Sequence, residues 1–429
     1  MKAALHIAAF ATFICSLSAS AVDFDSVFAD STLRVDYTLA GNDKDCRVFL
    51  SRQHKSAGWY GRRHNMSELP LQGNGIITMT DSLTGDTIYR HSFSTLFHEW
   101  RETAEAGCTS RSYENSFVLP LPHKVAKVTV ELLDSRHRVV AANSHYYSPT
   151  DILVYDATPQ RVAEYSYIHR GGDPREVIDV AILAEGYTEA ERGSFIDDAR
   201  NAVDAVFSHE PFASHRDDFN FIAVWTPSAD SGVTVPRKGE WRRTAFGSHY
   251  DTFYSDRYLT TPNVSAIYDS LAGVPFEHII ILANSPVYGG GGIYNSYTLT
   301  TSKNSNFRPV VVHEFGHSFG GLADEYFYPG DEMSSLYPID IEPWEPNITT
   351  LVDFDSKWKA IVPESTPVPT PAADAERYSV GVFEGGGYSF KGVYRPADRC
   401  RMRDNEWPTF CPACQRAIES LIDFYVGKK

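Results

Sequence analysis

The stretch from Arg308 to Glu325 reads RPVVVHEFGHSFGGLADE and contains the pattern HExxH. Three consecutive valines precede the pattern, so we expect a helix over residues 308–320 that is buried in the core of its domain. Residues four apart lie on the same face of a helix, and His313 and His317 can therefore bind one ion from the same side. The stretch predicts a buried helix that presents a metal site.

The chemistry of this site follows from its residue types. Zinc binds imidazole nitrogens and carboxylate oxygens, and a catalytic zinc keeps one position open for water. Glu314 is rotated by about 100° from His313 around the helix axis. Its carboxylate can therefore take the proton of a metal-activated water and pass it to the leaving amine without binding the metal. We expect Zn²⁺ as the cofactor, peptide-bond hydrolysis as the reaction and Glu314 as the general base.

A third metal ligand is expected shortly after the helix. Gly320 and Gly321 are poor helix formers and permit positive φ, which allows the chain to turn back sharply. Asp324 and Glu325 follow, and adjacent residues of an extended segment point to opposite sides. One of the two carboxylates can therefore face the metal. We prefer Asp324, because it comes first along the chain and has the shorter side chain. Glu325 is the alternative.

The chain from residue 22 to about 155 has the pattern of a β-sandwich. Polar and apolar residues alternate in several short runs, and turn signals separate the runs. Clear examples are Arg34–Leu39, Gly75–Thr80 and Lys127–Leu133. The turn signal that begins at Asp81 predicts a hairpin between Ile76–Thr80 and Thr87–Tyr89. We recognise no catalytic constellation in this part of the sequence.

From about residue 168, predicted strands alternate with predicted helices, which indicates an α/β or α+β domain. The expected strands are 176–184, 219–224 and 278–283, and the expected helices, besides 308–320, are 188–207 and 414–426. The whole chain is expected to be α+β. Its expected parts are a signal peptide (1–21), a β-sandwich domain (22–155) and a zinc metallopeptidase domain (156–429).

The first residues have the organisation of a secretory signal. Met1-Lys2 is followed by an apolar run and then by small residues up to Ala21, after which we place the cleavage. The protein is therefore expected to be secreted, periplasmic or at the cell surface. No later run reaches 18 apolar residues, so no transmembrane segment is expected. The net charge of −16 makes the chain a poor nucleic-acid binder.

Five cysteines follow the expected signal peptide, and an exported protein permits disulfides. Cys46 and Cys108 both lie in the N-terminal part, and we predict that they pair. Cys400, Cys411 and Cys414 form a local group with one thiol left over. Cys411-Pro-Ala-Cys414 has the spacing of a redox pair or of half a zinc knuckle. Because there is no second CxxC, a structural disulfide with Cys400 is our preferred interpretation.

A glycine-rich stretch precedes the helix of the metal site. Four glycines follow Tyr288 and run into Ile293, and glycines let another backbone come close. This segment can form the edge of a cleft that pairs with an extended substrate. Gly290, Gly291 and Ile293 are therefore candidate substrate-binding residues. A flexible loop before an ordinary strand explains the same pattern equally well.

The stretch from His313 to Tyr326 resembles the active-site signature of the M64 metallopeptidases, the family named for bacterial immunoglobulin A peptidase. Further segments resemble the family, so that nearly the whole mature chain is covered; they are Ser92–Trp100, Asp251–Leu259, Tyr288–Ser296 and Tyr394–Asp404. The resemblance implies a metzincin-like domain with His313 and His317 as zinc ligands. It also implies that Met402 is the methionine turn beneath the metal, although a plain core methionine is the alternative.

The sequence departs from the common metzincin pattern HExxHxxGxxH at one position. Ala323 stands where the third histidine of that pattern would fall, so the third ligand rests on the argument for Asp324 given above. The intact His313, Glu314 and His317 favour an enzyme that acts on protein or peptide substrates. A non-enzymatic surface protein that binds glycans or proteins is the alternative function. A zinc amidase acting on cell-wall peptides is a third.

Overall fold

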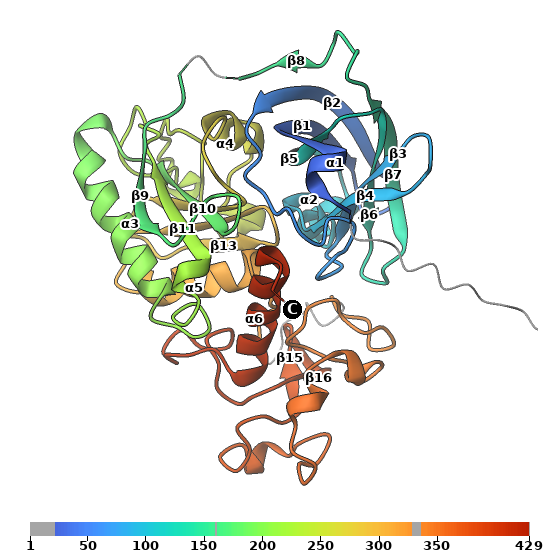
Figure 1. The fold of residues 1–429 in the computed structure, drawn as a ribbon. Helices are drawn as coiled ribbons and strands as arrows, with labels where there is room; N and C mark the ends of the chain where they lie inside the picture. Colours follow the sequence, from blue (N-terminus) through green and yellow to red (C-terminus); the bar gives the residue numbers. More distant parts are fainter. Residues whose placement is uncertain (1–21, 159–160, 328–335, 429) are drawn as a thin grey trace, which may run out of the picture.

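A computed structural model describes residues 22–158, 161–327 and 336–428, so the expected signal peptide lies outside the described residues. The chain is α+β, and sheets dominate it. In Figure 1 a β-rich N-terminal part, coloured blue to teal, lies beside a second part that contains a larger sheet. The C-terminal helix runs near the middle of the molecule, and a two-stranded hairpin lies next to it.

Two four-stranded sheets build the N-terminal part and enclose one hydrophobic core. Their strand orders are β5-β1-β2-β8 and β4-β3-β6-β7. The strands are β1 (Phe28–Gly41), β2 (Cys46–Ala57), β3 (Gly75–Asp81), β4 (Thr87–Phe93), β5 (Arg111–Pro122), β6 (Ala126–Leu133), β7 (Val139–Tyr147) and β8 (Tyr155–Asp156). Alternate residues of β1 and β6, for example, face this core, as in a β-sandwich. The hairpin expected around Asp81 is present, since β3 pairs with β4 in antiparallel fashion.

A six-stranded sheet of order β13-β14-β12-β10-β11-β9 organises the second part. The four inner strands are parallel, and both edge strands are antiparallel to their neighbours. The bounds are β9 (Tyr165–Arg170), β10 (Ile178–Glu185), β11 (Phe219–Val224), β12 (His278–Ala283), β13 (Gly290–Ile293) and β14 (Tyr297–Thr301). Every residue of β10, β11 and β12 is buried, which explains why these strands are continuous apolar runs in the sequence.

Helices cover both faces of this sheet. Helices α3, α5 and α6 pack on one face, and α4 packs on the other. The helices are α1 (Phe24–Val27), α2 (Leu96–Arg101), α3 (Arg192–Val206), α4 (Val264–Ser270), α5 (Phe307–Ser318) and α6 (Pro412–Val426). Helix α3 begins later than expected because Glu189–Glu191 form a separate 3-10 turn, which Thr188 caps. No helix of the described residues is long and apolar enough to cross a membrane.

The remaining regular elements are short. Strands β15 (Phe383–Gly386) and β16 (Ser389–Arg395) form the C-terminal hairpin. Single 3-10 turns lie at Ala104–Gly107, Glu189–Glu191, Arg216–Asp218, Pro236–Lys238, Thr252–Tyr254, Phe354–Ser356, Lys359–Ile361 and Ala372–Asp374. The Pro-rich stretch 363–373 is mostly exposed.

The N-terminal part is bound tightly to the second part. The backbone nitrogen of Ser94 donates to the carbonyl of Tyr294 at 2.9 Å, immediately after β13. The Asn65 side chain donates to the carbonyl of Phe424 in α6 at 2.8 Å. The Arg34 guanidinium forms an ion pair with Asp269 at 2.5 Å. The β-sandwich therefore supports the sheet edge next to the helix that carries the HExxH pattern.

Helix α5 lies directly against the backbone of β13. A Cβ atom on Gly292 would lie 2.3 Å from the carbonyl oxygen of Glu314 and 2.9 Å from the Cβ of His317. A Cβ atom on Gly290 would lie 2.8 Å from a carboxylate oxygen of Glu314. Only glycine leaves room for the helix at this distance, so the glycine run sets how closely HExxH approaches the sheet edge.

We predict that Gly292→Ala destabilises the protein by about 1–3 kcal/mol, because the added methyl group meets backbone that cannot move aside. Gly193→Ala is the matched control. Nothing lies within 4 Å of a Cβ at that position of α3, and alanine there should stabilise the helix by up to about 1 kcal/mol. Thermal unfolding of both variants tests the contact. Equal melting temperatures for the two variants would contradict it.

Candidate metal centre

Three potential ligand atoms converge at the C-terminal end of α5. The Asp324 Oδ1 atom lies 3.1 Å from the Nε2 atom of His313 and 3.3 Å from the Nε2 atom of His317. The two Nε2 atoms are 3.1 Å apart. Asp324 and His313 are buried and His317 is nearly so. The structure thus brings together all three residues that we expected to hold the metal.

Backbone carbonyls fix the orientation of both imidazoles. The Nδ1 atom of His313 lies 3.0 Å from the carbonyl oxygen of Arg401, and that of His317 lies 2.6 Å from the carbonyl oxygen of Leu322. A carbonyl only accepts, so each Nδ1 carries the hydrogen and donates it. Each Nε2 then presents a lone pair, as in a metal-binding histidine. Two nitrogen lone pairs and a carboxylate oxygen therefore face one point, which a cation would stabilise.

The charges at this point agree with that geometry. Burial lowers the pKa of His317, but attraction to Asp324 outweighs burial and raises this pKa to about 9. A metal ion would displace the proton that this attraction favours on Nε2, because a histidine binds metal as the neutral imidazole. Burial raises the pKa of Asp324, but the nearby His317 and His313 hold it well below its usual range. The Asp324 carboxylate is therefore ionised at neutral pH. An ionised carboxylate is the form that binds a metal ion.

The chain reaches this arrangement by a sharp return after α5. Gly321 has a φ of +58°, which favours glycine, and its backbone nitrogen donates to the carbonyl of His317 at 3.0 Å. The side chain of Asn347 then binds both the nitrogen and the carbonyl oxygen of Ala323, at 2.7 and 2.9 Å. The hydroxyl of Tyr388, in the turn of the β15–β16 hairpin, donates to Asp324 Oδ2. The return loop is thus held from two distant parts of the chain.

Met402 lies directly beneath α5 at the level of the two histidines. Its side chain is buried, and its sulfur would lie 2.7 Å from a Cβ atom on Gly316. The carbonyl of Met402 accepts a hydrogen bond from the backbone nitrogen of Glu325 at 2.9 Å. The segment around Met402 therefore contacts the helix and the return loop together.

Glu314 occupies the side of the helix that faces β13. Its carboxylate lies over Gly290, close enough that a Cβ there would be 2.8 Å away. Burial raises the pKa of Glu314, while His313 and His317 act in the opposite direction. Glu314 is not a member of the convergent group. It stands beside that group, between the candidate metal site and the sheet edge.

Comparison with protein families agrees with this arrangement. A family model described as IgA Peptidase M64 matches residues 167–380 and 373–422, and one described as Peptidase M64 N-terminus matches residues 23–143. The chain belongs to the M64 peptidase family. A search of curated proteins finds no match. The M64 assignment makes the chain a peptidase and points to a metallopeptidase, and the convergent group is a possible metal site.

An acidic residue of the N-terminal part lies near the candidate metal site. Its position there is not apparent from the sequence. Glu99 lies in α2 and accepts a hydrogen bond from the hydroxyl of Tyr258. Burial raises the pKa of Glu99 to about 7, and His317 and Glu314 are close enough to affect it electrostatically. The N-terminal part of this M64 peptidase therefore contributes a titratable group to the surroundings of the HExxH helix.

The glycine strand is less open than we expected. The backbone nitrogen of Gly290 donates to the carbonyl of Arg257 at 3.3 Å, and its carbonyl accepts from Leu259 at 3.5 Å. The ring of Tyr258 covers Gly291, and Ile293 is buried in the core on the α4 side of the sheet. β13 is an edge strand of its sheet, but the 257–259 segment already occupies part of that edge.

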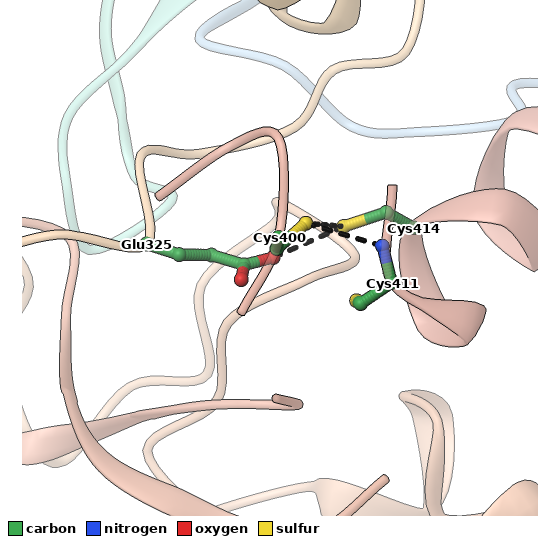
Figure 2. Close-up of side chains that lie close together, drawn as sticks. All are labelled: Glu325, Cys400, Cys411 and Cys414. Carbon is green, nitrogen blue, oxygen red and sulfur yellow. Dashed lines mark hydrogen bonds between the residues drawn. The ribbon is translucent and has the colours of Figure 1, made fainter. Parts of the chain in front are cut away.

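Glu325, the alternative third ligand, lies away from the two histidines. Its carboxylate is buried next to Cys400, Cys411 and Cys414, as Figure 2 shows. Asp324 and Glu325 thus point to opposite sides, as expected for adjacent residues of an extended segment. These three cysteines are free thiols in the structure, so the expected disulfide with Cys400 is not formed in it. Cys46 and Cys108 are free as well, so the disulfide that we predicted between them is not formed in the structure.

We predict that Tyr388→Phe weakens metal binding by roughly 10–100-fold, because the variant loses the hydroxyl that orients Asp324. Asp324→Ala should weaken binding further, since it removes a ligand atom. Tyr394→Phe, on the same hairpin, is the matched control and should bind metal normally. Zinc affinities measured by competition with a chromophoric chelator decide the order. Equal affinities for Tyr388→Phe and Tyr394→Phe would show that the tyrosine does not support the site.

Proposed function

We propose that the protein is a secreted zinc-dependent endopeptidase that hydrolyses peptide bonds in protein or peptide substrates. The observation that carries this proposal is the convergence of His313 Nε2, His317 Nε2 and Asp324 Oδ1 on one point. Two imidazoles and a carboxylate make a donor set that zinc uses in catalytic sites, where a fourth position stays open for water. The buried, orientated donors of this chain fit that ion.

Zinc bound there would polarise the substrate carbonyl and lower the pKa of a water to about 7. His313 and His317 keep their lone pairs directed at the ion because the carbonyls of Arg401 and Leu322 hold their Nδ1 hydrogens. Tyr388 holds the Asp324 carboxylate in place. We propose that the buried Met402 side chain packs beneath α5 and supports it, as the methionine turn does in metzincins.

Glu314 is proposed to be the general base. It stands beside the ligands on the side that faces β13, so it can accept a proton from the attacking water at a carboxylate oxygen. Burial raises its pKa, which makes the carboxyl a better proton carrier near neutral pH. The same oxygen would then donate the proton to the leaving amine. One residue thus serves both halves of the reaction.

We propose that the substrate lies along β13, with the backbone of Gly290, Gly291 and Ile293 in the wall of the cleft. Support comes from Glu314, which lies directly over Gly290. Because the backbone groups of Gly290 are bonded to the 257–259 segment, an extended substrate would pair beside Gly292 or displace that segment. In either case the glycines have no side chains, which leaves room for a peptide to approach Glu314.

A non-enzymatic surface binding protein with a degenerate metal domain is the competing function. The family assignment and the intact HExxH residues argue against it. Casein cleavage with and without a chelator separates the two functions. Cleavage that the chelator abolishes and added zinc restores is the result that the peptidase proposal requires.

We predict that Glu314→Ala binds zinc normally, because all three ligands remain, but loses peptidase activity by about 10²–10⁴-fold. Glu376→Ala is the matched control. Glu376 is exposed and distant from Glu314 in the sequence, so this variant should retain full activity. The measurements are zinc content by elemental analysis and turnover of a quenched peptide. Near-normal turnover in a zinc-loaded Glu314→Ala protein would contradict the assignment of Glu314 as the general base.

A further inference from the structure

A second group of potential metal ligands lies close to the first and plays no part in the proposed reaction. It consists of Glu325, Cys400, Cys411 and Cys414, and one ligand atom from each lies within 4.8 Å of the others. All four residues are buried, with at most 3% of any of them exposed. Figure 2 shows their side chains directed toward one another from separate segments of the chain.

The spacing of the sulfurs suits a single ion. The Sγ atoms of Cys400 and Cys414 are 3.8 Å apart. At a zinc–sulfur distance of about 2.3 Å, two ligands of a tetrahedral ion are about 3.8 Å apart. A disulfide would need about 2.05 Å between the sulfurs. The Glu325 Oε1 atom lies 3.0 Å from the Sγ of Cys414.

An unpartnered buried oxygen also points to a cation. Glu325 Oε1 accepts a hydrogen bond from the Asn347 side chain at 3.0 Å, but Oε2 has no hydrogen-bond partner among the described residues. Leaving a carboxylate oxygen buried without a partner is costly. Burial raises the pKa of Glu325 well above its usual value, and a bound cation would oppose this and favour the carboxylate.

Burial raises the pKa of Cys400 and Cys414, so their thiolates would form as an ion binds, and positive groups nearby would help to stabilise them. Cys411 is the N-cap of α6 and Cys414 lies in its first turn, where the partial positive charge of the helix stabilises thiolates. The backbone nitrogen of Cys411 donates to the Sγ of Cys400 at 3.3 Å. The buried Arg395 is close enough to Glu325 to act on it electrostatically. These positive groups offset part of the charge of three thiolates and a carboxylate.

We propose that Glu325, Cys400, Cys411 and Cys414 bind one zinc ion as a structural site, separate from the proposed catalytic site. Thiolate-rich tetrahedral sites select zinc, and a closed set of four protein ligands is typical of a structural ion. Binding releases the thiol protons to solvent. The ion would join three segments: the return loop after α5, the turn that leads to Met402, and the start of α6.

The position of this second site explains why it would be useful. Glu325 is adjacent to Asp324, and Cys400 precedes Met402 by two residues. An ion that holds Glu325 and Cys400 would therefore fix the backbone that presents Asp324 and the floor beneath α5. A disulfide between Cys400 and Cys414 would hold only two of the three segments. It would also leave Cys411 and the buried Glu325 Oε2 without a role.

The test uses the full-length protein purified without reducing agent and loaded with Co²⁺ in place of zinc. Thiolate ligands give intense sulfur-to-cobalt charge-transfer bands, whereas nitrogen and oxygen ligands do not. We expect these bands in the wild-type protein and in His317→Ala, which disrupts only the first site. Cys414→Ser should lose them and lose one of two zinc ions per chain, whereas Cys108→Ser, which removes an exposed thiol elsewhere, should keep both.

Several outcomes would overturn the second site. Absence of the charge-transfer bands in wild-type protein is the simplest, and it needs no variant that might fold poorly. A Cys400–Cys414 or Cys411–Cys414 disulfide in unreduced peptides, found by mass spectrometry, is another. The result is independent of the catalytic proposal, because loss of casein cleavage in a protein that keeps its thiolate bands would contradict only the proposed function.

Discussion

The turn at Gly321 is the constraint on which the rest of the site depends. Its positive φ sends the chain back along α5, so that Leu322 meets His317 and Asp324 meets both histidines. Because the returning segment is extended, the next residue, Glu325, points to the opposite side. One glycine thus determines the composition of two neighbouring groups of ligands, and any other residue there would be strained.

Close packing around α5 keeps this turn in place. Glycines of β13 let the helix lie against the sheet edge, and Gly316 leaves room for the sulfur of Met402 on another side. Carbonyls of Arg401 and Leu322 hold the two imidazoles in the tautomer that a metal needs. The site is therefore specified by backbone contacts as much as by the ligands themselves, which is why it requires a whole domain around it.

The sequence predicted what depends on local pattern. The strands 219–224 and 278–283 are found with the same bounds because they are wholly buried. Asp324, the carboxylate that we preferred, lies beside the two histidines. Contacts between distant residues could not be read in this way. Tyr388 is 64 residues from Asp324, and Glu99 is 159 residues from Tyr258. The grouping of Glu325 with three cysteines depends likewise on where three separate segments meet.

The measurement that tests the account most directly is anomalous diffraction at the zinc absorption edge from crystals of the full-length protein. The account predicts a peak at the meeting point of His313 Nε2, His317 Nε2 and Asp324 Oδ1, within about 2.0–2.2 Å of all three. It also predicts that Glu314 lies outside the ligand sphere of that ion, on the side of β13. A peak bound by only one of the histidines, or no peak between them in active protein, would contradict the account.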